Sequence, residues 1–217
     1  MIEVQRAAAP PASLADEKDW REEDVLHQLH ADFLGKCYLT EVIVPRGGFE
    51  VDHRHPRNDG GWAFDWANLY PASKDANVRR QKSWPAGGML HPDGRGDDVE
   101  GRLIQDVIID ETDIECRFEP LNPKDLAASN TARELERLHN DDSTGPKALD
   151  LRQAIKHRLL RMTLLERQVR EARAKRPDAD EVRRRLEAEF RRFVSRRSPF
   201  TALVRSQVHP SLHDLFD

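Results

Sequence analysis

A long amphipathic helix is the feature of this sequence that most restricts its fold. Near the C-terminus, apolar residues recur at steps of three or four, as one buried face of a helix requires. These residues are Leu151, Ile155, Leu159, Met162, Leu165 and Val169. Pro177 is expected to end this helix, and Asp178 with Glu181 resembles a capping box for a second one. The second face is formed by Val182, Leu186, Phe190 and Phe193. The pattern predicts a C-terminal helical hairpin that packs on another element.

The composition excludes several classes of protein. Hydrophobic residues make up 38% of the 217 residues and charged residues 34%, so the core must be small relative to the surface. No apolar run approaches the roughly 20 residues of a membrane-spanning helix, and the N-terminus lacks the pattern of a secretory signal. Two cysteines, Cys37 and Cys116, cannot supply a disulfide scaffold or a four-cysteine zinc site. We therefore expect a cytoplasmic protein without a membrane partner.

The charges are unevenly distributed along the chain, although the net charge is only -4. Acidic residues outnumber basic ones over 93–142, and basic residues outnumber acidic ones over 147–205. This pattern is typical of a protein that binds a polyanion or an acidic partner, or whose two regions compensate each other. Solvated helix faces are the simpler interpretation, because most charge runs are of that kind.

The N-terminal half predicts a unit of two strands and a helix. After an extended start, apolar spacing predicts a helix over 20–34, which Gly35 ends. Strand formers at 37–44 and 49–53, separated by a Pro-Arg-Gly-Gly turn, predict a β-hairpin. A short helix is expected within 68–82, which completes a ββα unit.

The middle of the chain predicts a second pair of strands. Apolar residues alternate within 99–118, as in strands with one buried face. Asn122 and Pro123 then indicate the start of a helix, with Asn122 as the capping residue. We see no internal repeat.

Residues 49–85 carry the most informative chemistry. Hydrolysis of a phosphodiester needs a base that works near neutral pH, and histidine suits that role. It also needs a divalent cation, whose preferred ligands are carboxylate and amide oxygens, and basic groups to hold the phosphates. The stretch offers each of these in the Asp52-His53 pair, in Asn68 and Asn77, and in the basic residues that follow Asn77.

At these residues the sequence resembles the HNH endonucleases, whose fold is a ββα-metal module. Their pattern of an Asp-His pair, a later Asn and a final Asn or His on the helix is matched here by Asp52-His53, Asn68 and Asn77. The resemblance implies that His53 is the general base and that Asp52 and Asn77 bind Mg²⁺ or Mn²⁺. It makes Asn68 a catalytic-site residue that fixes the loop orienting His53. The predicted nucleic-acid contacts are Arg54, His55, Arg79, Arg80 and Lys82.

A narrower resemblance extends over more of the chain. Gly35-Lys36-Cys37-Tyr38, Trp84-Pro85 and the helical C-terminal region resemble the HNH subunit of Septu-type and retron-associated anti-phage systems, which works beside an ATPase subunit. Many relatives also carry two Cys-x-x-Cys pairs around a structural zinc. Here only Cys37 of those four cysteines is present, so no structural zinc is expected. Apolar packing by Trp62, Phe64, Trp66 and Tyr70 is expected instead.

These observations predict an α+β protein in three parts. Residues 1–34 form an N-terminal extension with a helix, 35–90 the ββα-metal module, and 91–217 a strand pair and helical region. The expected function is metal-dependent cleavage of DNA in anti-phage defence, with an ATPase partner. Two alternatives remain open, namely cleavage of RNA and a non-catalytic subunit that binds a partner. His55 is more simply interpreted as a surface histidine before Pro56.

Overall fold

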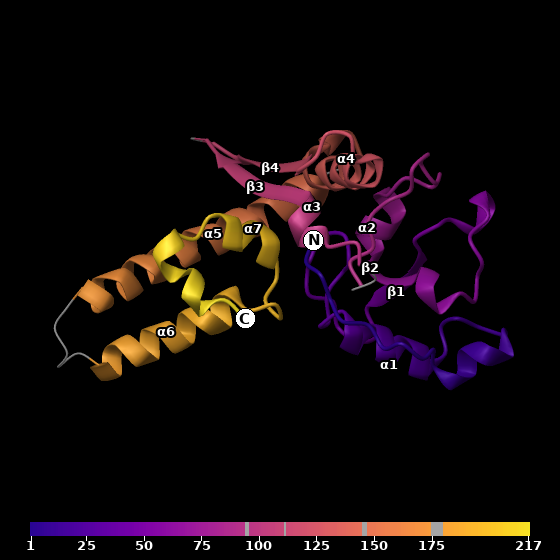
Figure 1. Cartoon of the computed structure of the whole chain (residues 1–217), viewed down its shortest axis with the longest axis horizontal. Coiled ribbons are helices and arrows are strands. Elements are labelled where there is room, and N and C mark those ends of the chain that lie inside the picture. Colours follow the sequence, from indigo (N-terminus) through magenta and orange to yellow (C-terminus); the bar gives the residue numbers. More distant parts are fainter. Residues whose placement is uncertain (94–95, 111, 145–146, 175–179) are drawn as a thin grey trace.

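The computed structural model describes residues 1–93, 96–110, 112–144, 147–174 and 180–217. Its elements, in chain order, are η1 (Ala12–Asp16), α1 (Glu23–Asp32), β1 (Phe49–His53), η2 (Arg57–Asp59), η3 (Trp66–Asn68), β2 (Leu69–Ser73), α2 (Lys74–Arg79), α3 (Val99–Arg102), β3 (Leu103–Ile109), β4 (Ile114–Pro120), α4 (Leu126–Asn140), η4 (Asp142–Thr144), α5 (Lys147–Ala174), α6 (Asp180–Val194), α7 (Thr201–Ser206) and η6 (Pro210–Leu215). Figure 1 shows α1, β1, β2 and α2 at one end of the molecule and the α5–α6 hairpin at the other. The combination of helices with small antiparallel sheets agrees with the predicted α+β class.

The predicted ββα order is present, and the predicted strand at 49–53 is β1, but its partner is β2 and not the predicted segment 37–44. β1 pairs with β2 in antiparallel fashion, with Asp52 opposite Tyr70 and His53 opposite Leu69. The segment 37–44, predicted as the first strand, is a loop with a single bridge between Lys36 and Ile43. The reason is that the amide of Cys37 bonds to the carbonyl of Val42, so this segment folds back on itself instead of extending beside β1.

Local chemistry explains where α1 ends and where α2 begins. The Ser73 side chain accepts a hydrogen bond from the amide of Ala76 and so caps the start of α2. Helix α1 ends before Gly35, whose φ of 71° is the left-handed conformation that favours glycine. The amide of Gly35 bonds to the carbonyl of His30, which satisfies one of the free carbonyls at the helix end. Gly35 therefore ends this helix, as predicted.

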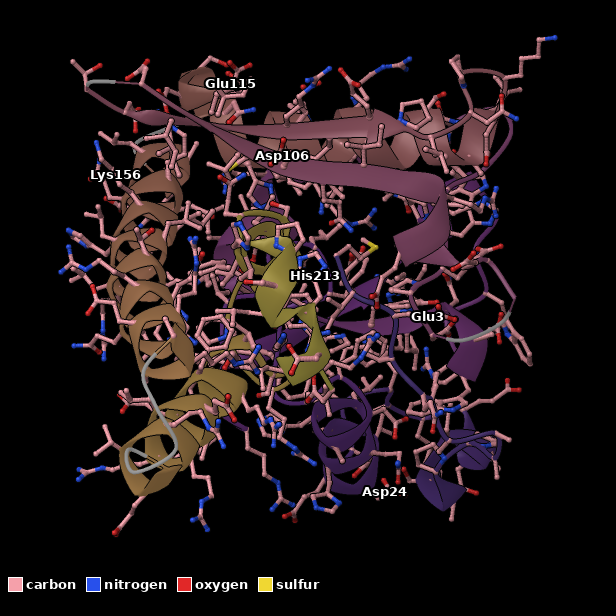
Figure 2. The ribbon with its side chains drawn as sticks, turned by 60° about the vertical axis from the view of Figure 1, so that its left-hand side comes forward. Glu3, Asp24, Asp106, Glu115, Lys156 and His213 are labelled. Atoms are coloured by element: carbon pink, nitrogen blue, oxygen red, sulfur yellow. The ribbon has the colours of Figure 1, made fainter. Side chains whose placement is uncertain are left out.

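The second predicted strand pair is confirmed. β3 and β4 pair from Leu103 opposite Pro120 to Ile109 opposite Ile114. Buried and exposed side chains alternate along β4, so one face of this β3–β4 ribbon packs on the protein and the other meets solvent. Figure 2 shows the ribbon across one end of the molecule, with Asp106 on β3 and Glu115 on β4.

The helical predictions are largely confirmed. Helices α5 and α6 pack against each other, and all the predicted apolar residues of α5 are buried. On α6, Phe190 is buried as predicted, whereas Val182 is 60% exposed because it lies at the start of the helix. Helix α4 starts later than expected, because the Asp125 side chain, not Asn122, caps it by accepting from the amide of Ala128. The predicted stop at Pro177 and the capping residue Asp178 lie outside the described residues. Among the described residues, no helix is long and apolar enough to cross a membrane.

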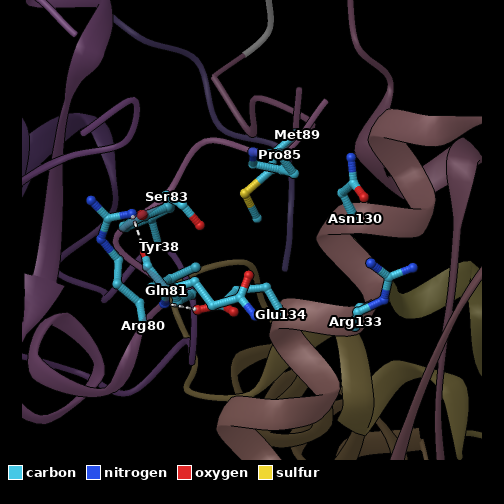
Figure 3. Close-up of a pocket in the computed structure, with 10 residues that line it drawn as sticks. Tyr38, Arg80, Gln81, Ser83, Pro85, Met89, Asn130, Arg133 and Glu134 are labelled. Atoms are coloured by element: carbon cyan, nitrogen blue, oxygen red, sulfur yellow. Dashed lines mark hydrogen bonds between the residues drawn. The ribbon is translucent and has the colours of Figure 1, made fainter. Parts of the chain in front are cut away.

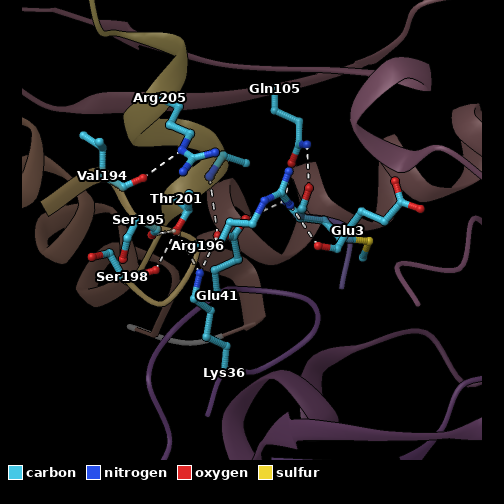
Figure 4. Close-up of polar contacts among 12 residues, drawn as sticks. Glu3, Lys36, Glu41, Gln105, Val194, Ser195, Arg196, Ser198, Thr201 and Arg205 are labelled. Carbon is cyan, nitrogen blue, oxygen red and sulfur yellow. Dashed lines mark hydrogen bonds and ion pairs between the residues drawn. The ribbon is translucent and has the colours of Figure 1, made fainter. Parts of the chain in front are cut away.

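The N-terminal segment and the loop before β1 join the two ends of the molecule through buried charges. Glu41 is paired with the ammonium of Met1 at 2.9 Å and with Lys36 at 3.4 Å, and Lys36 also donates to the Thr201 hydroxyl. Burial raises the pKa of Glu41, but these two cations outweigh it and hold the pKa at about 2. Figure 4 shows these contacts between the loop that holds Lys36 and Glu41 and the segment that leads into α7.

The packing of aromatic and cysteine side chains agrees with the sequence in most places. Trp66 and Tyr70 are buried as predicted, whereas Trp62 is 60% exposed and takes no part in the core. Cys37 and Cys116 are both buried small side chains, as expected. Burial raises the pKa of the Cys116 thiol to about 12, so this sulfur is protonated and unreactive near neutral pH.

Candidate active site in the cleft between strand β1 and helix α2

An open cleft of about 280 Å³ lies where β1 ends beside α2. Three of the four predicted catalytic and metal-binding residues, Asp52, His53 and Asn77, line it together. The other lining residues are Trp20, Val51, Pro56, Arg57, Asn58, Arg80 and Lys82.

A single hydrogen bond fixes the protonation of the His53 ring. Its Nε2 lies 3.0 Å from the carbonyl oxygen of Ala63, in the loop that connects β1 to β2. A carbonyl can only accept, so Nε2 carries the proton. In the neutral ring, Nδ1 then has the free lone pair, and among the described residues no donor is hydrogen-bonded to it. His53 can therefore accept a proton through Nδ1.

The surroundings of His53 favour its neutral form. Burial lowers the pKa of the ring, and the nearby Arg57 and Arg80 lower it further. The Ala63 carbonyl and Asp52 act in the opposite direction and do not cancel the effect. A base must be unprotonated before it reacts, so a lowered pKa keeps His53 ready at neutral pH.

Asp52 is buried and already has two partners. Its carboxylate pairs with Arg80 at 2.6 Å and accepts a hydrogen bond from the Tyr38 hydroxyl at 2.7 Å. Burial and the Asp52 charge together raise the pKa of Tyr38 well above its usual value, so this hydroxyl remains a donor. Arg80 also donates to the carbonyls of His53, Arg54 and Gln81. Arg80 thus neutralises Asp52 and ties the end of β1 to the segment after α2.

Asn77 presents its amide oxygen on the side of the cleft away from Glu50. Its Nδ2 donates to the Glu50 carboxylate at 2.7 Å, which fixes the orientation of the amide. Oδ1 lies 3.4 Å from the ammonium of Lys82, which also donates to the Asn77 carbonyl. Helix α2 therefore positions an oxygen donor opposite the strand that carries Asp52.

Asn68 has the contacts that the sequence interpretation assigned to it. Its Oδ1 accepts from the amide of His55 at 2.7 Å, and its Nδ2 donates to the His55 carbonyl at 2.9 Å. A weaker bond of 3.4 Å reaches the Trp62 carbonyl. These bonds close the long loop between β1 and β2, the loop that also supplies the Ala63 carbonyl to His53.

The predicted nucleic-acid contacts separate into accessible and buried groups. Lys82 and Arg80 line the cleft, but only Lys82 is exposed there, since Arg80 is paired with Asp52. Arg79 is buried and bonds to Asp75 and to the carbonyl of Leu138 on α4. Arg54 is 1% exposed and lies against the rings of Tyr38, Tyr70 and Trp84. The burial of Arg54 and Arg79 keeps both away from a phosphate, which corrects the prediction for these two residues.

Arg80 also separates the cleft from a second, smaller pocket beside α4. Figure 3 shows this pocket, with Arg80 and Gln81 on one side and Glu134 on α4. The amide of Gln81 donates to Glu134 at 2.9 Å, so α4 holds the segment that follows α2 in place. The helical region thereby supports the position of Arg80.

His55 lies outside the cleft lining. Its Nε2 is 2.6 Å from the carbonyl of Asp59, and its ring stacks on Trp84 with centroids 4.8 Å apart. His55 is half-buried, so it is not the simple surface histidine of the alternative interpretation, and its side chain contacts the loop and Trp84.

Five lining residues lie outside the predicted site, and two of them, Arg57 and Trp20, bear on its chemistry. Arg57 lies four positions after His53, and the polar Arg-Asn-Asp run that it opens is a signal that could have been used. Trp20 lies more than thirty positions before His53, and nothing in its local sequence indicates that it reaches the cleft. Arg57 places a further exposed cation beside His53, which suits a cleft for an anionic substrate.

The donors on the cleft are of the type that Mg²⁺ prefers. Asp52 and Asn77 offer one carboxylate and one amide oxygen, both hard ligands. Among the described residues, no group of three or more His, Cys, Asp or Glu side chains is arranged to hold a metal. The donor types suit a hard cation, but the Asp52 carboxylate is engaged by Arg80 and Tyr38, and Asn77 Oδ1 lies near Lys82. Arg80 competes with such a cation for Asp52.

Comparisons with known proteins leave this geometry as the main guide to function. No family model, no curated protein and no solved structure matches the chain.

Proposed function

We propose that this protein is a metal-dependent endonuclease of the HNH type that hydrolyses phosphodiester bonds of DNA. The observation that carries the proposal is the state of His53. Its Nε2 is held by the Ala63 carbonyl, so Nδ1 is left as the acceptor in a cleft that also contains Asp52 and Asn77. A neutral imidazole beside two oxygen ligands is the arrangement that base-assisted hydrolysis requires.

The proposed reaction begins with proton transfer to His53. Nδ1 removes a proton from a water molecule, and the resulting hydroxide attacks phosphorus in line with the leaving 3′ oxygen. Arg57 and Lys82 face the cleft and attract the phosphate. Mg²⁺, held by Asp52 and Asn77, would supply the positive charge that stabilises the phosphate and the leaving oxygen. Asn68 and the Ala63 carbonyl keep the base in position.

The biological role is proposed from the resemblance alone. A role as the nuclease of an anti-phage system, acting with an ATPase subunit, follows from the likeness of residues 35–85 to that class. The exposed arginines of α6 offer a charged surface for such a subunit.

The proposal is tested by cleavage of matched substrates. The purified chain is incubated with a supercoiled plasmid and with an RNA transcript of the same sequence, in Mg²⁺, in Mn²⁺ and in EDTA. We expect nicked or linear plasmid in either metal and none in EDTA. Cleavage of the RNA but not of the plasmid would show that RNA, and not DNA, is the substrate. A folded protein that cuts neither, with or without a candidate ATPase subunit, would contradict nuclease function and favour a partner-binding role.

A further inference from the structure

Trp20 reaches the proposed active site from outside the ββα module. It lies between η1 and α1, in the N-terminal region. Its ring meets the His53 ring edge to face, with centroids 4.9 Å apart and an interplanar angle of 84°. It also contacts the ring of Phe64 at 5.7 Å. Phe64 follows Ala63, so Trp20 packs both on the proposed base and beside the residue that accepts its hydrogen bond.

Arg57 covers the same indole ring. Its guanidinium carbon lies 4.5 Å from the centroid of Trp20, within the range of a cation–π contact. Trp20, Arg57 and His53 all line the cleft. The indole thus lies in contact with both a cation suited to bind phosphate and the histidine proposed to take the proton.

The hydrogen bond to Ala63 fixes only one point of the His53 ring. The ring can still turn about its Cβ–Cγ bond, which would change the position of Nδ1. The perpendicular contact with Trp20 restricts that rotation, because edge-to-face packing of aromatic rings has a preferred geometry. A base displaced by even 1 Å can lose about 100-fold in rate.

We propose that Trp20 is a positioning residue that fixes the orientation of the His53 ring at the cleft and keeps Arg57 beside it. This inference rests on the proposed nuclease function for its catalytic consequence, but the contact itself can be measured without activity. It also means that the ββα module is incomplete without the N-terminal region, which the division of the sequence at residue 34 did not anticipate.

The test combines NMR of the ring contact with cleavage rates. The variants are Trp20→Ala, the conservative Trp20→Phe, and the matched control Trp62→Ala, which removes an exposed tryptophan from the neighbouring loop. The ring signals of His53 are assigned by their loss in His53→Ala. We expect nuclear Overhauser contacts between the Trp20 and His53 rings in the wild type. The His53 ring signals should shift in Trp20→Ala, stay close to the wild type in Trp20→Phe, and be unchanged in Trp62→Ala.

The cleavage rates should follow the same order. In Trp20→Ala, kcat should fall about tenfold or more. KM should change little, and Trp20→Phe should recover most of the rate. A kcat in Trp20→Ala that equals the wild-type value would overturn the positioning role.

The outcomes separate this inference from the proposed function. Ring contacts between Trp20 and His53 in a chain that cuts no nucleic acid keep the contact and remove the nuclease. Unchanged His53 ring signals in folded Trp20→Ala overturn the inference even if the nuclease is active. Should Trp20→Ala fail to fold, the nuclear Overhauser contacts in the wild type decide the matter, and their absence overturns it.

Discussion

The two antiparallel strand pairs of this protein differ in what they bury. In the β3–β4 ribbon, β4 alternates buried apolar residues with exposed charged ones, and Ile109 pairs with Ile114 close to the turn. The β1–β2 pair carries two buried polar residues, Asp52 and His53, at the end of a strand, and a long loop separates its strands. The ribbon is therefore organised around packing, whereas the β1–β2 pair holds charged groups in place. Charge changes should affect the β1–β2 pair strongly and the ribbon weakly.

Loss of Arg80 should have the largest effect on stability. Arg80→Gln removes the partner of the buried Asp52 carboxylate, and an unpaired buried charge costs about 3–5 kcal/mol. Urea unfolding should show a loss of that size in the free energy of unfolding. The double variant Arg80→Gln with Asp52→Asn should recover a large part of the lost stability, because it no longer contains an unpaired buried carboxylate. No recovery in the double variant would contradict the account of the pair.

The helical region should give the protein its acid sensitivity through His139 on α4. Burial lowers the pKa of His139 to about 4, below its usual 6.5. The unfolded chain therefore takes up this proton first as the pH falls. The stability that depends on neutral His139 is fully present above pH 6.5. As the pH falls from 6.5 to 4, the free energy of unfolding decreases by up to about 3 kcal/mol.

Comparison of the wild type with His139→Gln measures this contribution. The difference between their unfolding free energies should vary with pH in that window and be constant above it. A constant difference from pH 7 to 4 would show that His139 does not titrate in this way. Glu41 interferes little in this window. Because its pKa is held at about 2, the stability that depends on its charge is lost only below about pH 4.5.

Asn68→Ala should have a smaller effect on stability and a clear one on the cleft. It removes the bonds of 2.7 and 2.9 Å to the His55 backbone, and buried groups left without partners cost about 1–3 kcal/mol. Hydrogen exchange should become faster in the loop between β1 and β2 and stay the same in the ribbon. Unchanged exchange at the amide of His55 would argue against the role of Asn68 in the loop.

The smallest effect is expected at the exposed pair of Arg117 and Glu119 on β4. Both side chains are close to half exposed, and such pairs contribute little to stability because water screens them. Arg117→Ala is the matched control for Arg80→Gln, since each removes one guanidinium from an ion pair. Equal losses in urea unfolding would remove the distinction between the two strand pairs.

The sequence predicted the ribbon and the helices better than the β1–β2 pair, for a physical reason. Alternation in β4 and the helical repeat in α5 are local patterns that follow from burial of one face. The partner of β1 is chosen across a long loop. Strand formers at 37–44 were closer in sequence, but their backbone bonds within the segment. The Pro71 in β2 also lowers its resemblance to a strand.

The candidate site was predicted in part. Asp52, His53 and Asn77 come together on one cleft, and Asn68 bonds to the loop. The burial of Arg54 and Arg79 was missed because a run of basic residues does not reveal which ones face the core. Trp20 was missed because its contact with His53 is made by tertiary packing across distant segments.

Substitution of His53 tests the central claim most directly. Plasmid cleavage in Mg²⁺ is compared for the wild type, His53→Ala and the control His55→Ala, whose ring lies outside the cleft lining. The account predicts that His53→Ala folds normally and loses about 10²–10⁴-fold in rate, while His55→Ala keeps most of the activity. A His53→Ala protein that cuts at the wild-type rate would contradict the assignment of the base and, with it, the proposed active site.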